Sequence, residues 1–181
     1  IDGQKPGDIH YVDVNGDKAI TADDRVIMGN SEPKFNYFAN ITARWKGIDL
    51  EILFQGVRGV EAYYGGNFAV PLRLDGNSTT PQEFHLDYWT PENPGAFFPR
   101  LTPTPGNNSL SSDYWKFDAS YCRVKYIQLG YTFKQDWTRK FFVNNLRLFV
   151  NFQNPFTLSA ESRVDPEGRG GHTTYPMVKT Y

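Results

Sequence analysis

The segment from Asp13 to Asp24 has a spacing of oxygen-bearing residues that metal chemistry would require. Side-chain oxygens stand at its first, third, fifth, ninth and twelfth positions, and the backbone carbonyl of the seventh completes the series. The six residues are Asp13, Asn15, Asp17, Ala19, Thr21 and Asp24. Calcium takes about six to eight oxygen ligands, and this order is that of a calcium loop. The sequence therefore predicts a structural Ca²⁺ site without a catalytic role.

Two positions of this loop depart from the usual pattern. Lys18 occupies position six, where glycine normally makes the sharp turn, and a left-handed backbone at another residue costs roughly 1–2 kcal/mol. Asp24 at position twelve is one methylene shorter than the usual glutamate. We therefore expect weak affinity for calcium. The alternative interpretation is an Asx-rich surface turn that caps a short helix from about residue 21 to residue 28.

The composition narrows the class of protein. The 181 residues carry a net charge of −1 and only 22% are charged, so nothing favours binding to nucleic acid. Aromatic residues make up 16%, and glycine and proline are frequent, which is typical of β-structure with long loops. Cys122 is the sole cysteine and cannot form a disulfide within the chain.

Alternating apolar and polar side chains predict the strands. The pattern runs through 36–46 and again through 48–55, and the intervening Lys46-Gly47 predicts a hairpin. Two more strands are expected at 121–133, with a β-bulge near Tyr126, and at 146–156. The polar-face candidates are Asn40, Arg44, Glu51, Gln55, Arg147 and Asn151. A soluble sandwich would bury the apolar face, whereas a membrane barrel would turn it to lipid, and the alternation fits both.

A connection of some 65 residues separates the hairpin from the third strand. Its many aromatic residues disfavour disorder, so we expect an ordered loop with a short helix near 81–89. Four aromatic residues are candidates for stacking on sugar rings or contacting a partner protein, or else they pack the loop itself: Tyr63, Tyr64, Trp89 and Trp115. His10, His85 and His172 lie in dissimilar loops, and no pairing of nucleophile and base is recognisable. We therefore expect no enzyme.

Several short motifs follow one another along most of the chain. They are Pro6-Gly7-Asp8-Ile9 before the acidic loop, Asp24 to Asn30, Pro33-Lys34-Phe35, Trp45 to Leu50, Phe54-Gln55-Gly56, Tyr114-Trp115, Asp118-Ala119-Ser120, Arg123-Val124-Lys125, Leu129 to Thr132, Asn151 to Thr157, and Tyr175-Pro176 with Lys179-Thr180-Tyr181. In this order they resemble the C-terminal region of SusC/RagA-type TonB-dependent transporters of the Bacteroidetes outer membrane. Lys18 departs from the glycine usual in that family's acidic loop.

The resemblance implies an all-β fold, in which this chain supplies C-terminal strands of a large antiparallel transmembrane β-barrel of about 22 strands with long extracellular loops. It implies an active importer of oligosaccharides or peptides in the bacterial outer membrane. The implied partners are the rest of the barrel and its plug domain, a SusD-like lipoprotein, outer-membrane lipid, and TonB through an N-terminal part that this sequence lacks. The polar-face residues would then line the lumen.

On this expectation residues 1–34 form an extracellular loop with the calcium-type motif, and residues 35–56 form a barrel hairpin. Residues 57–120 form a long extracellular loop, and residues 121–181 hold the last barrel strands, the final one cut short. The alternative function is a secreted calcium-dependent carbohydrate-binding or adhesion module. A soluble, folded monomer would favour that alternative.

Overall fold

A computed structural model of the chain describes residues 4–72, 81–104, 106–168 and 179–180. These residues form two compact units. One unit takes the described residues within 1–30 and 62–117 together with Gly168, and the other takes those within 31–61, 118–167 and 176–181.

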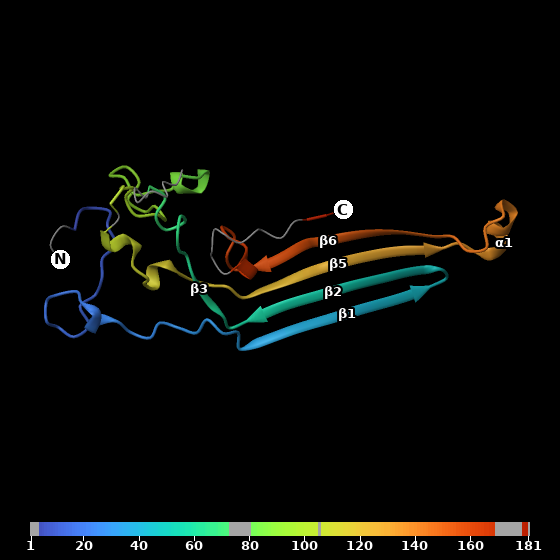
Figure 1. The fold of residues 1–181 in the computed structure, drawn as a ribbon, viewed down its shortest axis with the longest axis horizontal. Coiled ribbons are helices and arrows are strands. Elements are labelled where there is room, and N and C mark those ends of the chain that lie inside the picture. Colours follow the sequence, from blue (N-terminus) through green and yellow to red (C-terminus); the bar gives the residue numbers. More distant parts are fainter. Residues whose placement is uncertain (1–3, 73–80, 105, 169–178, 181) are drawn as a thin grey trace. The chain divides into compact units, whose positions relative to one another are not determined.

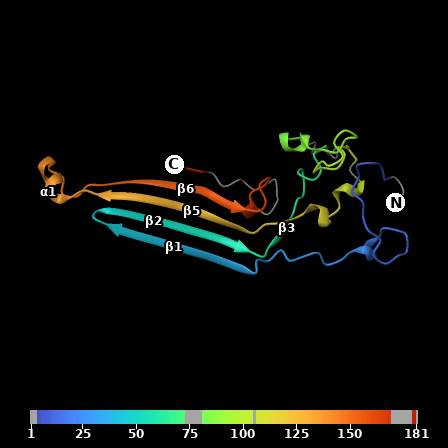
Figure 2. The same ribbon diagram turned by 180° about the vertical axis from the view of Figure 1, so that it is seen from behind.

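The second unit is built on a four-stranded antiparallel sheet in the order β1-β2-β5-β6 (Figure 1). The strands are β1 (Phe35–Trp45), β2 (Ile48–Arg58), β5 (Tyr121–Thr132) and β6 (Arg147–Ser159). Figure 2 shows the same four strands side by side from behind. All four strands predicted from the alternation are present, and β2 and β6 each continue a few residues beyond the predicted ends.

A two-residue turn joins β1 to β2. Lys46 and Gly47 both have positive φ angles, 48° and 92°. Two successive left-handed residues make the tight turn whose twist matches that of antiparallel strands. The carbonyl of Gly47 also accepts a hydrogen bond from the Thr132 N–H at 2.7 Å, which ties the turn to the end of β5. The predicted hairpin is thus confirmed.

The predicted bulge lies one residue before Tyr126. In the β2–β5 pair, Leu53 faces Tyr126 and Phe54 faces Val124, so Lys125 is the extra residue. The β5–β6 register shifts at the same place, where Asn154 has a φ of 49°. The bulge moves the apolar residues of both halves of β5 onto one face, as the change of phase in the sequence requires.

The connection from β5 to β6 contains a short helix, α1 (Gln135–Thr138), followed by a 3₁₀ turn, η5 (Arg139–Phe141). Phe142 ends this turn with a φ of 61°, a left-handed conformation that a bulky residue seldom adopts. The Val143 N–H then bonds the Thr138 carbonyl, which closes the helical end.

Between β2 and β5 the described chain is ordered but mostly irregular. It contains β3 (Glu61–Tyr63), which pairs with β4 (Lys116–Asp118), and the 3₁₀ turns η2 (Glu83–Leu86), η3 (Gly106–Ser109) and η4 (Asp113–Trp115). The strand pair is an addition to the prediction, which placed no strand in this connection. The short helix expected near 81–89 is the single 3₁₀ turn η2.

Aromatic side chains form the core of the first unit. Phe68 stacks on Tyr64 with ring centroids 4.3 Å apart, and Phe98 lies 5.2 Å from Phe68. Trp115 is almost fully buried beside Phe98 and donates its indole N–H to the Asn108 carbonyl. Aromatic rings bury large apolar areas each, which explains how a connection with little regular structure is held in one conformation.

Two further 3₁₀ turns complete the described structure, η1 (Ala22–Asp24) and η6 (Pro166–Gly168). The helix considered for residues 21 to 28 is therefore only the three-residue turn η1. Within the described residues, no helix has both the length and the apolar character that crossing a membrane requires.

Candidate functional site

The strand register sorts the side chains of the four-stranded sheet onto two faces. Directly opposed residues of antiparallel strands lie on the same face, and alternate residues of each strand follow them. Arg44 faces Asp49, Gln128 faces both Glu51 and Asn151, and Thr132 faces Arg147. By this rule all six residues predicted for the polar face share one face: Asn40, Arg44, Glu51, Gln55, Arg147 and Asn151.

Side chains on this polar face bond one another across strands. The Asn40 amide donates to Glu51 Oε1 at 3.1 Å. The Arg147 guanidinium lies 2.5 Å from Asp49 Oδ2 and 3.1 Å from Asp49 Oδ1. Asp49 was not among the predicted site residues, although its place in the alternation puts it on this face. The face is a hydrogen-bonding surface of mixed charge.

The opposite face is apolar and open. Its members alternate with the polar set and include Tyr37, Ile41, Ile48, Ile52, Leu148 and Val150. Half or more of the side-chain surface is exposed at Ile41, Leu148 and Val150, and the whole of β1 is exposed. A sheet that shows alternating apolar residues to its surroundings on one face needs a cover or an apolar solvent for that face.

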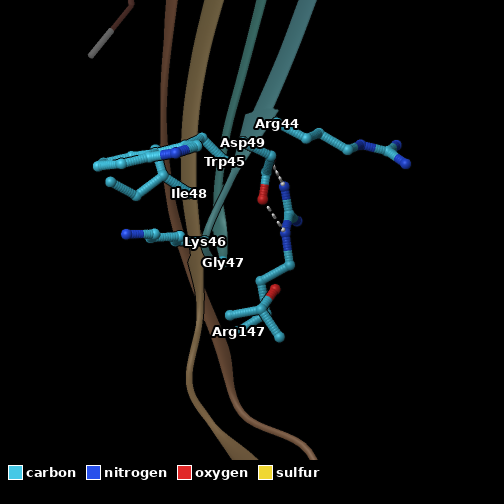
Figure 3. Close-up of a pocket in the computed structure, with 8 residues that line it drawn as sticks. Arg44, Trp45, Lys46, Gly47, Ile48, Asp49 and Arg147 are labelled. Atoms are coloured by element: carbon cyan, nitrogen blue, oxygen red, sulfur yellow. Dashed lines mark hydrogen bonds and ion pairs between the residues drawn. The ribbon is translucent and has the colours of Figure 1, made fainter.

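A shallow cavity of about 480 Å³ lies at the turn end of the sheet. Figure 3 shows that Arg44, Asp49 and Arg147 extend to one side of the strands, whereas the Trp45 ring, Ile48 and Lys46 extend to the other. The Asp49 carboxylate is the acidic group that lines this cavity, and its charge is paired with that of Arg147. The remaining charged groups that line it, Arg44 and Lys46, are basic.

A second charged cluster lies near the other end of the polar face. Arg123 is 2% exposed and bonds Asp165 Oδ1 and Glu167 Oε2, each at 2.7 Å. Its Nε donates to the Thr157 hydroxyl at 2.9 Å, and Lys125 Nζ lies 3.2 Å from both carboxylate oxygens of Glu167. Sequence reasoning missed this network, because its carboxylates come from a loop more than 40 residues after Arg123.

The structure gives the four loop aromatics different surroundings. Tyr64 and Trp115 are 5% and 1% exposed inside the aromatic core. Trp89 lies against the backbone of Gly7, where an added Cβ would stand 2.4 Å from the indole ring. Tyr64 and Trp115 are therefore part of the packed core, whereas Trp89 is only half-buried and keeps part of its surface open. Tyr63 is half-buried in β3 and keeps part of its surface open.

The N-terminal segment is fastened to the first unit by Asp8. Its carboxylate lies 2.6 Å from the Arg100 Nε and accepts from the Asn108 amide at 2.8 Å. Burial by itself raises the pKa of Asp8, but hydrogen bonds from the Lys5 N–H and from both side chains outweigh it and hold the pKa below its ordinary value. Asp8 is therefore anionic at neutral pH and holds Arg100 in place.

The acidic loop folds on its own side chains. Asp13 accepts from the N–H groups of Gly16 and Lys18, at 2.6 and 2.7 Å, and Asp24 accepts from those of Val14 and Thr21, at 2.9 and 2.7 Å. Lys18 has a φ of 66°, so position six takes the left-handed turn that the spacing requires. Hydrogen bonds from Thr21 and then Val14 lower the pKa of Asp24.

The loop's donor set suits a hard cation, because all its candidate ligands are oxygens. Asn15 and Asp17 likewise accept from backbone N–H groups two residues ahead, at 2.9 and 2.8 Å. Across the described residues, His, Cys, Asp and Glu side chains nowhere form a group of three or more arranged to hold a metal.

His85 is the buried histidine of the first unit. Its Nδ1 accepts from the Gln82 N–H at 2.9 Å and its Nε2 lies 3.0 Å from the Phe68 carbonyl. These partners fix the neutral ring with its proton on Nε2, and burial lowers the pKa of His85. His10 is exposed, and His172 lies outside the described residues.

Comparisons with known proteins agree on one class. The chain is 31% identical over 177 residues to the TonB-dependent receptor P26 of Formosa agariphila, covering 92% of this chain and 17% of that protein. It is 26% identical over 180 residues to the TonB-dependent receptor SusC of Bacteroides thetaiotaomicron, covering 98% and 17%. The chain thus spans about a sixth of the length of these curated relatives. No family model matches the sequence.

Solved structures show the same fold. The RagAB peptide importer in its closed-closed state matches 93% of this chain and 19% of the neighbour's chain, with a TM-score of 0.65 and 22% identity. In the open-open state the coverage is 89% and 18%, with a TM-score of 0.61 and 21% identity. The predicted all-β, antiparallel fold is confirmed.

Over most of its length, then, the chain is a homologue of TonB-dependent receptors. Within that class the relatives include SusC and the structural neighbours belong to RagAB, so the resemblance to SusC/RagA-type transporters is confirmed. The expectation that the chain is no enzyme agrees with these relatives, which are named receptors and importers.

Proposed function

We propose that this chain forms part of the wall of a TonB-dependent importer of nutrients in the bacterial outer membrane. The observation that carries the proposal is the four-stranded sheet with one open apolar face and one hydrogen-bonded polar face. Its strands of 11 to 13 residues meet the length of about 9–11 residues that a tilted strand needs to cross a bilayer. The apolar face then meets lipid and the polar face lines the lumen or contacts the plug.

The connection lengths support an orientation. At one end of the sheet β1 and β2 are joined by two residues, and β5 and β6 by the segment with α1. The opposite strand ends are those that residues 1–34, the long 57–120 connection and the loop that follows β6 enter or leave. Barrels of this kind have short periplasmic turns and long extracellular loops. We therefore assign residues 35–56 and the strands within 121–181 to the barrel and the long connections to the extracellular side.

One residue after β6 pairs with the outer edge of that strand. Thr180 forms an isolated antiparallel bridge with Gln153, with a 2.8 Å bond from the Gln153 N–H to the Thr180 carbonyl. The outer edges of β1 and β6 require strands of the remaining barrel, because lipid cannot satisfy unpaired backbone groups. The partners in this proposal are the rest of the barrel, its plug domain, and TonB acting through the N-terminal part.

For substrate and surface partner we propose oligosaccharides or peptides, delivered beneath a SusD-like lipoprotein. RagAB is named a peptide importer, and SusC is the named relative that matches 98% of this chain. The 1–34 and 57–120 loops offer the surface for the lipoprotein, with Tyr63 and Trp89 as the two half-buried aromatic residues among the four candidates. We further propose that the acidic loop binds Ca²⁺ weakly, supported by its ligand order and by the left-handed Lys18.

Cysteine scanning of the whole polypeptide tests the two faces. With Cys122 first replaced by serine, single cysteines at Ile41, Ile52 and Val150 should react only with a membrane-soluble maleimide. Cysteines at Asn40, Glu51 and Asn151 should react with a water-soluble reagent. Equal labelling of both sets from water would contradict the proposal, and recovery of the polypeptide as a soluble monomer would favour a secreted binding module instead.

A further inference from the structure

Aromatic rings extend the apolar face of the sheet into the β5–β6 connection. Tyr131, on that face near the end of β5, meets Phe133 edge to face with ring centroids 4.8 Å apart. Phe133 stacks on Trp137 of α1 at 5.3 Å, and Trp137 meets Phe141 of η5 at 5.6 Å. Four rings thus form one contiguous row from the strand into the helical turn. The row continues the apolar face beyond the last paired residues.

Most of this row is open to the surroundings. Trp137 and Phe141 are 50% and 64% exposed, and the neighbouring Phe142 is 99% exposed despite its left-handed backbone. The indole of Trp45, at the end of β1, is also mostly exposed and extends to the same side as Ile48 (Figure 3). Rings that gather at the end of an apolar face have the character of the interface between lipid tails and headgroups.

Basic side chains accompany these rings. Lys46 places its Nζ 4.8 Å from the Trp45 ring centroid, on the side of the strands that carries the apolar face (Figure 3). Lys134, Arg139 and Lys140 flank α1 and are exposed. Across 44–49 and 132–147 the charged residues are Arg44, Lys46, Lys134, Arg139, Lys140 and Arg147 against Asp49 and Asp136. Since Arg147 pairs with Asp49, this end of the sheet is strongly basic in a chain of net charge −1.

We propose that this basic and aromatic end binds the acidic headgroups of phospholipids in the inner leaflet of the outer membrane. The inference rests on the proposed function, which places the apolar face in lipid and the short connections on the periplasmic side. Lys46 then stands at the depth of the lipid phosphates while Trp45, Trp137 and Phe141 lie among the upper acyl carbons. The continuity with the apolar face favours a membrane over a soluble acidic partner, which would need the charges but not the rings.

The expected size of the effect follows from membrane electrostatics. A basic residue close to an anionic surface contributes a factor of about five to binding. Removing Lys46, Arg139 and Lys140 together should therefore reduce the preference for acidic lipid by up to about a hundredfold, because the three charges act on the same headgroup region.

The test uses the whole transporter polypeptide in nanodiscs of phosphatidylcholine with and without phosphatidylglycerol. Native mass spectrometry counts the lipids retained on the protein, and brominated versions of each lipid report proximity through quenching of tryptophan fluorescence. The unaltered protein should retain phosphatidylglycerol over phosphatidylcholine. The triple variant Lys46→Gln, Arg139→Gln, Lys140→Gln should lose that preference. The control Lys34→Gln, Arg58→Gln, which removes two exposed charges at the opposite end of the sheet, should keep it.

Several results would overturn the inference. Equal retention of the two lipids would do so, as would an identical loss in the control. A protein that inserts into the membrane without lipid preference refutes this inference alone. A protein that does not insert refutes the proposed function as well, so the two failures are distinguishable.

Discussion

Arg147 of β6 reaches Asp49 of β2 across the backbone of Gly130, which belongs to the strand between them. A Cβ at Gly130 would stand 2.6 Å from Asp49 Oδ2 and 2.7 Å from Arg147 Nη2. The ion pair thus bridges a strand and depends on the missing side chain. On the other face Gly56 plays the same part, because it lets the Tyr37 hydroxyl of β1 bond the Tyr121 carbonyl of β5 at 3.1 Å.

Replacing Gly130 with alanine should separate this ion pair. The atoms that a Cβ would meet are the ends of flexible side chains, so the pair should move apart while the strands stay in register. With alanine at position 130, a further Asp49→Asn change should then leave the thermal stability unchanged. With Gly130 present, the same change should lower it. Thermal unfolding of the four proteins of this double-mutant cycle measures the difference.

Gly95→Ala is the matched control, since a Cβ there meets nothing within 4 Å. It should leave the effect of Asp49→Asn unchanged. If Asp49→Asn lowers thermal stability equally with alanine and with glycine at position 130, the ion pair does not depend on Gly130.

Arg123→Ala should release the loop that carries Asp165 and Glu167. The change removes a buried guanidinium and leaves two partly exposed carboxylates close together without their shared partner. We expect a loss of about 2–3 kcal/mol, less than the roughly 3–5 kcal/mol for a fully buried pair because water reaches both carboxylates. Hydrogen exchange of residues 160–168 in the whole polypeptide measures the release.

In Arg123→Lys, hydrogen exchange of residues 160–168 should be faster than in the native protein and slower than in Arg123→Ala. Lysine keeps the positive charge but lacks the planar guanidinium group that binds two carboxylates. Arg58→Ala, at an exposed position of β2, should leave exchange of residues 160–168 unchanged. If residues 160–168 exchange as slowly in Arg123→Ala as in the native protein, the Arg123 network does not order this loop.

Acid should weaken the first unit through His85. Burial lowers the pKa of this histidine below its ordinary value of 6.5, so the folded state takes up a proton less readily than the unfolded state. The stability that the neutral ring supplies is therefore complete above about pH 6.5 and is lost as the pH falls through the folded-state pKa. Hydrogen exchange at Phe68 and Gln82, corrected for the intrinsic pH dependence of exchange, should show opening in that range.

His10→Gln should keep this pH dependence, because His10 is exposed. His85→Gln should remove it, whatever its effect on overall stability. Retention of the same pH dependence in His85→Gln would assign the titration to another group.

Calcium should order the acidic loop without changing the strands. In the whole polypeptide, added Ca²⁺ should slow hydrogen exchange of residues 13–24, and a chelator should reverse the effect. The double variant Asp13→Asn, Asp17→Asn should abolish the response, since it removes two of the charged ligands. Hydrogen exchange of the strands should be the same in either case. If exchange of residues 13–24 does not change with calcium or with chelator, the loop is not a calcium site.

The two faces of the sheet could be predicted from the sequence because they depend on a local property. Side chains of an extended strand alternate with a period of two, so the chain alone places Ile41 and Asn40 on opposite faces. The bulge in β5 was visible for the same reason, as a change of phase near Tyr126. The tight turn at Lys46 and Gly47 follows from residue type and spacing.

Other features depended on segments that meet only in the folded chain. The residues next to Trp115 in the sequence do not indicate that it contacts Phe98 and Asn108. From the local sequence alone, a buried aromatic ring cannot be distinguished from an exposed ring that stacks on a ligand. Arg123 likewise finds its carboxylates 42 and 44 residues further on. The sequence by itself determined the strands, their faces and the class of protein, because periodicity and motif order are carried by neighbouring residues. Only the tertiary structure decided which charges pair and which aromatic rings are buried, because those contacts join residues that are distant along the chain.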